Sequence, residues 1–463
     1  MNALKVGLLP LYVKYYDEVL PDLLARMNPF IERVHTELAD VGIDVIVAPT
    51  ARTEPEVAAS VERFESSGVD AIVTLHLAYS PSLESASVLT RTPLPILMLD
   101  TTPNRDFGRD VDPELLLYNH GIHGVQDLAS VLRRSGKPFR VIAGHLDDPE
   151  VIPRFVEVLR GARAANVLRS MRVLRIGGLF PGMGDFAVPD DLLESALGIS
   201  VENIVPDDLA ADVAAVREQE IAAEVASDAA CFRVDCSKEV HERSLRVGLG
   251  LRSFLEKGKF DAFSLNFLAF QDPSGPVSSV PFLECCKAMV RGIGYAGEGD
   301  ALTAALLGAL LQGFGAATFV EMFCADWHGE SLFLSHMGEI NHAEAAERPL
   351  LHEKDFPFTP ALNPAALACA LRPGKATYVN LAPGPGGSFR LITAEVEILA
   401  DGTHPGLDRW VRSWVRPKVR LPRFLEEFSH LGGTHHGVLV YGRHFDALAA
   451  FCAFLKIEHC HIT

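Results

Sequence analysis

The sequence predicts an α/β fold: two Rossmann-like parallel-sheet domains followed by a C-terminal antiparallel β-barrel domain. In the first third of the chain, short apolar segments alternate with amphipathic helical patterns, which is typical of a parallel sheet covered by helices on both faces. The same alternation resumes at about Val173. From about Thr318, short strands alternate instead with Gly, Pro and Asn turns, which indicates a β-rich, barrel-like domain.

The N-terminal domain is expected to span residues 1–168. In a parallel sheet of this kind the ligand face lies beyond the carboxyl ends of the strands, where the loops 76–81 and 119–124 fall. The predicted strands are 6–11, 45–49, 71–75, 95–99 and 140–143, and the helices between them are 21–40, 54–67 and 124–135.

A helix over about 149–170 is expected to lead into a central domain, residues 169–317. Within it we expect a strand at 173–176, a Gly-rich loop at 177–186, helices at 207–226 and 241–257, and a strand at 262–267. The uncharged segment 301–320 is long enough to span a bilayer, but glycines interrupt it and acidic residues flank it. We therefore expect a buried helix from Ala301 to about Leu311, followed by a turn and a strand that contains Glu321.

The C-terminal domain is expected over residues 318–463. Strands are predicted at 376–381 and 389–399, with residues 383–387 as the hairpin turn between them, and helix signal is weak until 445–455. Asp326, His328 and Glu330 could bind metal by composition, but we interpret this segment as a polar hairpin connection.

Composition and charge exclude several functional classes. The 463 residues are 48% hydrophobic and 22% charged, as in an ordinary globular protein. The net charge of −18 argues against a nucleic-acid partner and against an anionic membrane surface, because nothing in the chain could neutralise a run of phosphates. Eight scattered cysteines without a Cys-x-x-Cys pair, and an N-terminus without a signal-peptide pattern, predict reduced thiols in a cytoplasmic protein.

Histidines and glutamates stand where packing alone would favour apolar residues. His435 and His436 lead from a Gly-Gly turn into an apolar strand, and His336 stands at the end of another. Adjacent residues of a strand point to opposite faces, so only one of the pair is expected to reach a given site. Glu298 and Glu321 stand in similar positions, and two Glu with two His suit a catalytic divalent metal with open positions.

These residues also have structural interpretations. Asp300 fits an N-cap of the helix that follows it, whereas Glu298 lies two residues earlier, where no cap is needed. Glu321 alone could face water from an antiparallel strand, and His336 alone could be a core histidine. The first strand is not followed by G-x-G-x-x-G, so a dinucleotide cofactor has no support.

Short motifs in a shared order, over nearly the whole chain, resemble the L-arabinose isomerase family within the wider L-fucose/L-arabinose isomerase-like fold. Those around the glutamates and histidines are Ala296-Gly-Glu-Gly-Asp300, Phe319-Val-Glu321, Leu334-Ser-His-Met337 and Gly432-Gly-Thr-His-His436. Upstream, segment 119–124 resembles the family's Asn-Gln-x-x-His-Gly loop, 76–81 its aromatic Ser-Pro loop, and 262–267 its Phe-containing strand.

The resemblance implies a metal-dependent aldose–ketose isomerase that interconverts a free aldose such as L-arabinose and L-ribulose through a stabilised enediol. Its cofactor would be Mn²⁺, or another divalent cation such as Co²⁺ or Mg²⁺. Glu298 and Glu321 would be catalytic and, with His336 and His436, would bind the metal. The implied substrate-binding residues are His435, His123, His120, Tyr79, Phe267 and Phe319. The family also implies a homotrimer or homohexamer in which a neighbour's first domain contributes His123.

The chain departs from the family at positions expected to meet the sugar. His120 replaces a Gln, and Leu9-Pro-Leu-Tyr12 stands where the family has Ser-Gln-His-Leu-Tyr. These differences do not affect the four expected metal ligands, but they leave the identity of the aldose substrate open. The alternatives are the same chemistry on D-galactose/D-tagatose or L-fucose/L-fuculose, or a non-catalytic sugar-binding homologue. A metal-dependent hydrolase or lyase is less favoured, because it would want a His-rich zinc site.

Overall fold

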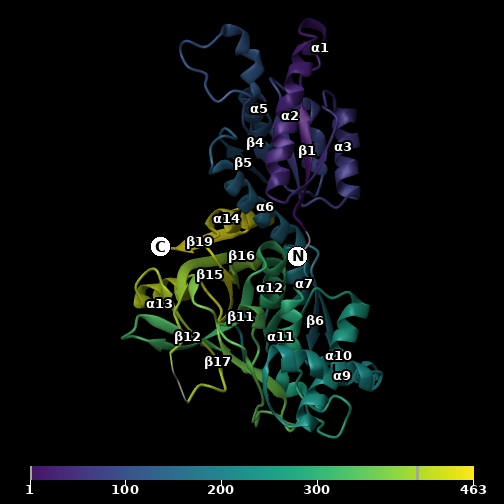
Figure 1. Cartoon of the computed structure of the whole chain (residues 1–463), viewed down its shortest axis with the longest axis vertical. Coiled ribbons are helices and arrows are strands. Elements are labelled where there is room, and N and C mark those ends of the chain that lie inside the picture. The colour runs from purple at the N-terminus through teal and green to yellow at the C-terminus, as the bar shows by residue number, and fades with distance from the viewer. Residues whose placement is uncertain (1–2, 403–405) are drawn as a thin grey trace. The chain divides into compact units, whose positions relative to one another are not determined.

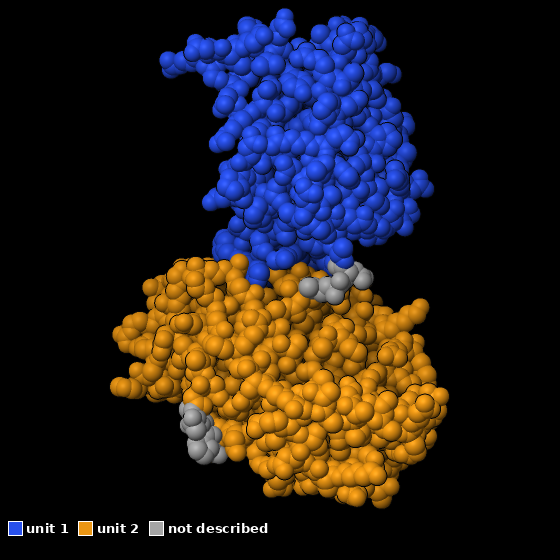
Figure 2. Space-filling view, viewed as in Figure 1, with its two compact units in different colours: residues 1–166, 444–456 blue, residues 167–443, 457–463 orange. Residues whose placement is uncertain are grey.

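The computed structural model describes residues 3–402 and 406–463, and the chain folds into two compact units (Figure 1, Figure 2). Unit 1 contains residues 1–166 and 444–456, and unit 2 contains residues 167–443 and 457–463. The division into domains 1–168, 169–317 and 318–463 stays a prediction.

Unit 1 contains a parallel sheet with strand order β2-β1-β3-β4-β5. All five predicted strands and the helices between them are confirmed to within about three residues at each end. The strands are β1 (Lys5–Leu11), β2 (Asp44–Val47), β3 (Ala71–His76), β4 (Ile96–Asp100) and β5 (Phe139–Ala143). The helices are α1 (Tyr16–Val19), α2 (Leu23–Asp40), α3 (Glu54–Ser66), α4 (Ala86–Arg91), α5 (Gly121–Arg134), α6 (Val151–Leu168) and α14 (Phe445–Leu455).

The helices of unit 1 follow local rules. In α2 the apolar residues Met27, Phe30, Val34 and Leu38 recur at helical spacing, and all four are buried. Helix α3 begins at a capping box, in which Glu56 accepts a hydrogen bond from the backbone N–H of Thr53. These signals are local, which is why the sequence predicted the elements well.

Unit 2 contains a second parallel sheet, of order β10-β9-β6-β7. Its strands are β6 (Arg172–Ile176), β7 (Ser200–Ile204), β9 (Ala262–Leu265) and β10 (Gly294–Gly297). Its helices are α7 (Asp190–Leu197), α8 (Ala210–Ala214), α9 (Glu218–Cys231), α10 (Lys238–Gly258), α11 (Phe282–Val290) and α12 (Ala301–Phe314).

The helix predicted at the start of segment 301–320 is present, whereas the helix predicted over 207–226 is divided into shorter ones. Helix α12 is buried along nearly all of its length, which confirms the prediction for the segment 301–320. Among the described residues, no helix has both the length and the apolar character that a membrane span requires. The prediction of a single helix over 207–226 was wrong. Arg217 has an extended backbone, and Glu220 accepts a hydrogen bond from the backbone N–H of Arg217, so a new helix, α9, starts after this residue.

The remainder of unit 2 is built around a closed barrel of antiparallel strands, in the order β16-β15-β18-β11-β12-β17, which the pairing of β17 with β16 closes. This barrel and the two parallel sheets confirm the predicted fold class. Its strands are β11 (Ala317–Asp326), β12 (Ser331–Ser335), β15 (Gly374–Pro383), β16 (Phe389–Ile398), β17 (Val411–Pro417) and β18 (His436–Tyr441). The sheet continues through β14 (Ala365–Ala370), β13 (Leu350–Glu353) and β8 (Arg233–Asp235) on one side and β19 (Glu458–Ile462) on the other.

The turns of the barrel agree with the sequence, but one helix was missed. Residues 383–387 connect β15 to β16, and residues 327–330 connect β11 to β12, as predicted. The expectation of little helix before residue 445 was wrong. Helix α13 (Leu421–His430) lies there and packs its buried Leu421, Phe424 and Phe428 against the barrel core. These three positions recur at helical spacing with charged residues between them, so the segment carries an amphipathic pattern that the prediction overlooked.

Candidate metal centre

Five residues singled out in the sequence come together in unit 2, where strand ends of its parallel sheet and its barrel meet. Glu298 follows β10, and Glu321 lies within β11. His336 directly follows β12, and His436 opens β18 with His435 just before it. Antiparallel pairing places Glu321 opposite His436 on one side and opposite Ser335, the neighbour of His336, on the other.

The Gly-Glu-Gly sequence around Glu298 has a steric explanation. Glu298 itself has a positive φ of 64°. A Cβ on Gly297 would lie 2.8 Å from the imidazole of His336, and a Cβ on Gly299 would lie 2.4 Å from the carbonyl oxygen of Gly178. Glycine on both sides therefore allows the carboxylate to approach the histidines closely.

The ligand atoms of the five side chains converge at separations of 3.5–3.9 Å. Glu298 Oε2 lies 3.5 Å from His436 Nε2 and 3.9 Å from His435 Nε2. Glu321 lies 3.6 Å from His336 Nε2 and 3.8 Å from His435 Nε2. Two atoms that each bind one ion at about 2.1 Å lie about 3–4 Å apart, so these separations suit metal ligands better than hydrogen bonds.

Three of these atoms are buried and unsatisfied. His336 Nε2, His436 Nε2 and Glu298 Oε2 have no hydrogen-bond partner among the described residues. Buried polar atoms normally find a partner, because leaving them bare costs free energy. A divalent cation would satisfy all three at once, so the residues present fit such an ion.

Two further carboxylates accept hydrogen bonds from the Nδ1 atoms of His336 and His436. His436 Nδ1 donates to Asp300 Oδ2 at 3.0 Å, and His336 Nδ1 donates to Glu339 Oε2 at 2.7 Å. Each bond leaves Nε2 directed toward the glutamates, which is the usual arrangement behind a metal-binding histidine. Asp300 also accepts the backbone N–H of Thr303, so its predicted N-cap role is confirmed.

The structure brings both members of the histidine pair to the same site, so the expectation that only one would reach it was wrong. His435 lies just before the first residue of β18, where the alternation of a strand no longer applies. Its ring centroid is 4.3 Å from that of His436. Burial opposes a charge on His435, but its hydrogen bond to Asp185 and the nearby carboxylates of Glu298 and Glu321 raise the pKa of His435 to about 10.

The two glutamates have different electrostatic surroundings. Burial raises the pKa of Glu321 above its usual value. Burial acts in the same sense on Glu298, but its contacts with His435 and His436 prevail and lower the pKa of Glu298 well below its usual range. Burial likewise disfavours a charged His336, yet Glu339 and the glutamates raise the pKa of His336 to about 9. The acids and imidazoles of the site therefore interact strongly with one another.

Aromatic rings surround the imidazoles. Phe319 is 1% exposed, and its ring centroid lies 4.9 Å from that of His336 and 5.1 Å from that of His436. Phe267 is also buried, with the ring of Phe180 5.6 Å away. A sugar contact of Phe267 or Phe319 stays a prediction.

The remaining predicted substrate residues lie in unit 1, around the start of α5. His120 Nε2 and His123 Nδ1 share a hydrogen bond of 2.7 Å, and the ring of Tyr79 lies near both. Tyr79 donates to Asp127, which also accepts from Ser82 and so holds this loop in place. A role of His120, His123 and Tyr79 in sugar binding stays a prediction.

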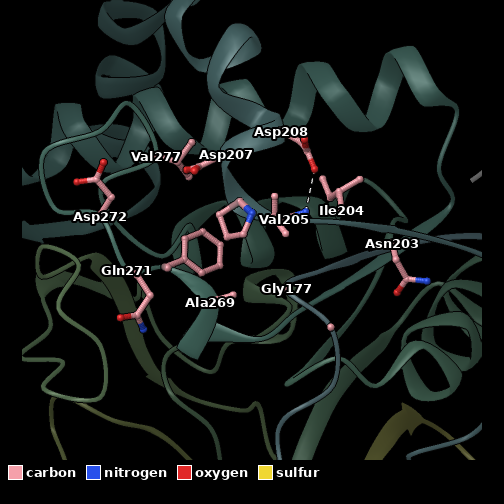
Figure 3. A pocket seen from close by; sticks show the side chains of 13 residues that line it. Gly177, Asn203, Ile204, Val205, Asp207, Asp208, Ala269, Gln271, Asp272 and Val277 are labelled. Carbon is pink, nitrogen blue, oxygen red and sulfur yellow. Dashed lines mark hydrogen bonds between the residues drawn. The ribbon is translucent and has the colours of Figure 1, made fainter.

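A pocket of about 720 Å³ lies at the carboxyl ends of β6 and β7 and beside the segment after β9 (Figure 3). The residues that line it include Phe270, Val277, Asp207, Asp208, Asp272, Gly177 and Gly178. Glu298 follows β10 at the same edge of this sheet, the edge at which open α/β sheets bind ligands.

Comparisons with known proteins agree on one family. A model described as the L-arabinose isomerase central domain matches residues 185–312, and one described as the L-arabinose isomerase C-terminal domain matches residues 316–458. An L-arabinose isomerase of Nocardioides sp. is 32% identical over 405 residues, covering 82% of this chain and 78% of the relative. One of Shouchella clausii is 27% identical over 460 residues, covering 96% of this chain and 91% of the relative.

Among solved structures, a periplasmic sugar-binding protein of an ABC transporter from Legionella pneumophila matches 67% of this chain and 90% of its own. The identity is 10% and the TM-score 0.17, so this likeness carries no argument about fold or function. The two domain models together cover more than half of the chain, and the relatives are named as one kind of enzyme. The chain therefore belongs to the L-arabinose isomerase family, and the prediction of a sugar isomerase is confirmed.

Proposed function

We propose that this enzyme interconverts L-arabinose and L-ribulose with Mn²⁺, or with a similar divalent cation, bound by Glu298, Glu321, His336 and His436. One observation carries the proposal: the unsatisfied buried atoms of Glu298, His336 and His436 converge beside a second carboxylate, Glu321. The names of the relatives supply the sugar.

The mixed donor set favours this kind of ion. Two carboxylates and two imidazoles suit manganese or cobalt, whereas Ca²⁺ prefers oxygen ligands alone and structural zinc prefers thiolates. A divalent cation in this site would act as a Lewis acid toward two neighbouring sugar oxygens and would stabilise the negative charge that develops on them.

The protein's own groups would move the protons. Conversion of an aldose into its ketose moves one proton from C2 to C1 and another from O2 to O1, with no net gain or loss of atoms. Glu321 would take the proton from C2 and return it to C1, as a carboxylate placed beside the enediol. The carboxylate of Glu298 would accept the hydroxyl proton that passes from O2 to O1.

His435 would donate to a sugar oxygen and assist ring opening. Its side chain is 29% exposed, whereas those of His336 and His436 are almost completely buried, so it is the imidazole nearest to solvent. His123 would serve the sugar from a neighbouring subunit in a homotrimer or homohexamer. The exposed apolar side chains of Leu83 and Ile122, close in sequence to Tyr79 and His123, support such an assembly.

An aldose panel tests the proposal. Metal-depleted protein is assayed with and without added Mn²⁺ on L-arabinose, D-galactose, L-fucose and D-arabinose, with ketose formation as the readout. Ketose that appears from L-arabinose only with Mn²⁺ would support the proposal, and ketose from another sugar would reassign the substrate. Bound manganese without ketose from any sugar would favour a sugar-binding protein instead.

A further inference from the structure

Asp185 holds His435 by two hydrogen bonds to a single carboxylate oxygen. Its Oδ2 accepts the backbone N–H of His435 at 3.0 Å and the ring Nδ1–H of His435 at 2.6 Å. Asp185 belongs to the loop between β6 and α7, whereas His435 lies beside barrel strand β18. One side chain therefore fixes both the backbone and the ring of a residue that the family resemblance implies to be a substrate contact.

The next residue of the loop contacts the other histidine. Phe186 is buried, and its ring stacks on His436 with a centroid distance of 5.1 Å and an interplanar angle of 8°. The ring of Phe186 also lies 5.6 Å from that of His435. Asp185 and Phe186 thus form a clamp on the histidine pair, with a polar contact to one ring and an apolar contact to the other.

The orientation of the His435 ring follows from this clamp. With Nδ1 bound to Asp185, the opposite ring nitrogen, Nε2, points between the carboxylates, 3.9 Å from Glu298 and 3.8 Å from Glu321. A rotation of the ring about its Cα–Cβ bond would move Nε2 away from both carboxylates.

We propose that Asp185 is the positioning residue for His435, and that its hydrogen bonds hold the Nε2 of His435 at the place where a sugar oxygen is bound beside Glu298 and Glu321. The inference rests on the proposed function, since it assigns His435 to the sugar. Asp185 itself contacts neither the carboxylates nor the proposed metal ligands through a hydrogen bond in the described structure.

Other contacts hold the backbone of this region without Asp185. Asn380, on β15, donates to the carbonyl oxygen of His436 at 2.6 Å and to Thr434 Oγ1 at 2.7 Å, and it accepts the backbone N–H of Thr434. The Gly-rich loop is held separately, because Phe180 donates its N–H to the carbonyl oxygen of Glu298. Loss of the Asp185 carboxylate should therefore free the His435 ring more than it disturbs the fold.

The test compares Asp185→Ala and Asp185→Asn with the full-length enzyme in its Mn²⁺-loaded form. We expect Asp185→Ala to lower kcat/KM by roughly 10- to 100-fold, the usual loss when the partner of a site histidine is removed. Asp185→Asn keeps an acceptor oxygen, so it should recover most of that loss. The melting temperature and the Mn²⁺ dissociation constant should stay close to those of the wild type in both variants.

A double-mutant cycle with His435→Ala separates positioning from a general structural role. If Asp185 acts through His435, the Asp185→Ala substitution should have no further effect once His435 has been replaced. Asp191→Ala is the matched control, since Asp191 is an exposed carboxylate nearby in the same segment whose side chain accepts the N–H of Leu192.

Four results would overturn the inference: wild-type kcat/KM in Asp185→Ala, an equal loss in the His435→Ala background, an Asn variant as impaired as the Ala variant, or a loss of activity that parallels loss of manganese or of folding. A failure of the proposed function itself is recognised from the wild-type enzyme rather than from the variants. In that outcome the wild type itself, loaded with Mn²⁺, forms no ketose, and the inference falls with it.

Discussion

Glu321 and His436 face each other as registered partners of the antiparallel strands β11 and β18. The same residue of β11 is paired on its other side with Ser335, directly before His336. Three adjacent barrel strands thus deliver one carboxylate and two imidazoles, and the loop after β10 adds Glu298. Because hydrogen-bond ladders fix the relative heights of these residues, the geometry of the site depends on strand register more than on side-chain packing.

Replacement of either glutamate should stop turnover without unfolding the protein. Glu321→Gln removes the proposed base, and we expect kcat to fall by roughly 10²–10⁴-fold, the range usual for general acid–base groups. Glu298→Gln should abolish turnover as well. Steady-state kinetics and circular dichroism measure the two effects. Glu397→Gln, at an exposed position of β16, is the control. Wild-type-like rates in either glutamate variant would contradict the proposed proton transfers by Glu298 and Glu321.

Removal of the carboxylate behind His336 should weaken metal binding. Glu339→Gln replaces the buried acceptor of His336 Nδ1, which also accepts from the hydroxyl of Tyr295. We expect the Mn²⁺ dissociation constant to rise by roughly 10- to 100-fold, because the ring loses its fixed orientation. Titration followed by electron paramagnetic resonance measures it, with the exposed Glu353→Gln as control. An unchanged dissociation constant would show that Glu339 has no part in holding a ligand.

A methyl group at Gly297 should block the site. The Cβ of Gly297→Ala would lie 2.8 Å from the ring of His336, so the imidazole would have to move. We expect loss of Mn²⁺ binding together with about 1–3 kcal/mol of destabilisation from overpacking. Isothermal titration and urea unfolding measure the two effects. Gly108→Ala should be neutral, because its Cβ would meet nothing within 4 Å. Normal manganese affinity in Gly297→Ala would contradict the described approach of the ring.

The stability of unit 2 should depend on pH through Glu224. Burial disfavours its charge, but ion pairs with Lys287 at 2.6 Å and Arg252 at 2.7 Å lower the pKa of Glu224 to about 2. A lowered carboxyl pKa contributes stability above the unfolded value of about 4.5, and that contribution is lost as the pH falls toward 2. Glu224→Gln should therefore cost about 1–2 kcal/mol at pH 7, after allowance for solvent screening.

Urea unfolding at a series of pH values checks this prediction. The difference in free energy of unfolding between the wild type and Glu224→Gln should be constant above pH 4.5 and should shrink below it. Glu256→Gln, at an exposed position of α10, is the control. A difference that stays constant down to the acid limit would mean that the ion pairs do not stabilise the fold.

Mixed oligomers should reveal whether His123 serves a neighbouring subunit. His123→Ala and Glu321→Gln are each expected to be nearly inactive. In a mixture reassembled from both variants, some sites would combine an intact Glu321 with a neighbour's intact His123, and about a quarter of the wild-type activity should return for random assembly in a ring. Size-exclusion chromatography with light scattering checks the assembly state. No recovery in a correctly assembled mixture would place His123 at its own chain's site or outside the reaction.

Local patterns were enough to predict much of this protein. Apolar periodicity and turn residues gave nearly all strands and helices of unit 1, because the strands of a buried parallel sheet and the helices that cover it carry strong periodic signals. The motifs around Glu298, Glu321, His336 and His436 predicted that these residues would share a site, and the structure brings them together. Helix α13 was missed although its three buried positions, Leu421, Phe424 and Phe428, recur at helical spacing.

The sequence by itself determined the fold class, the family and the set of acids and imidazoles, since each of these leaves a local or ordered pattern along the chain. Only the tertiary structure decided how the set is held. Asp185 and His435 are 250 positions apart, and Asp300 and His436 are 136 apart, yet both pairs are hydrogen-bonded. Partners of this kind leave no periodic signal in the sequence, because their meeting depends on strand register and on the loops of a different sheet.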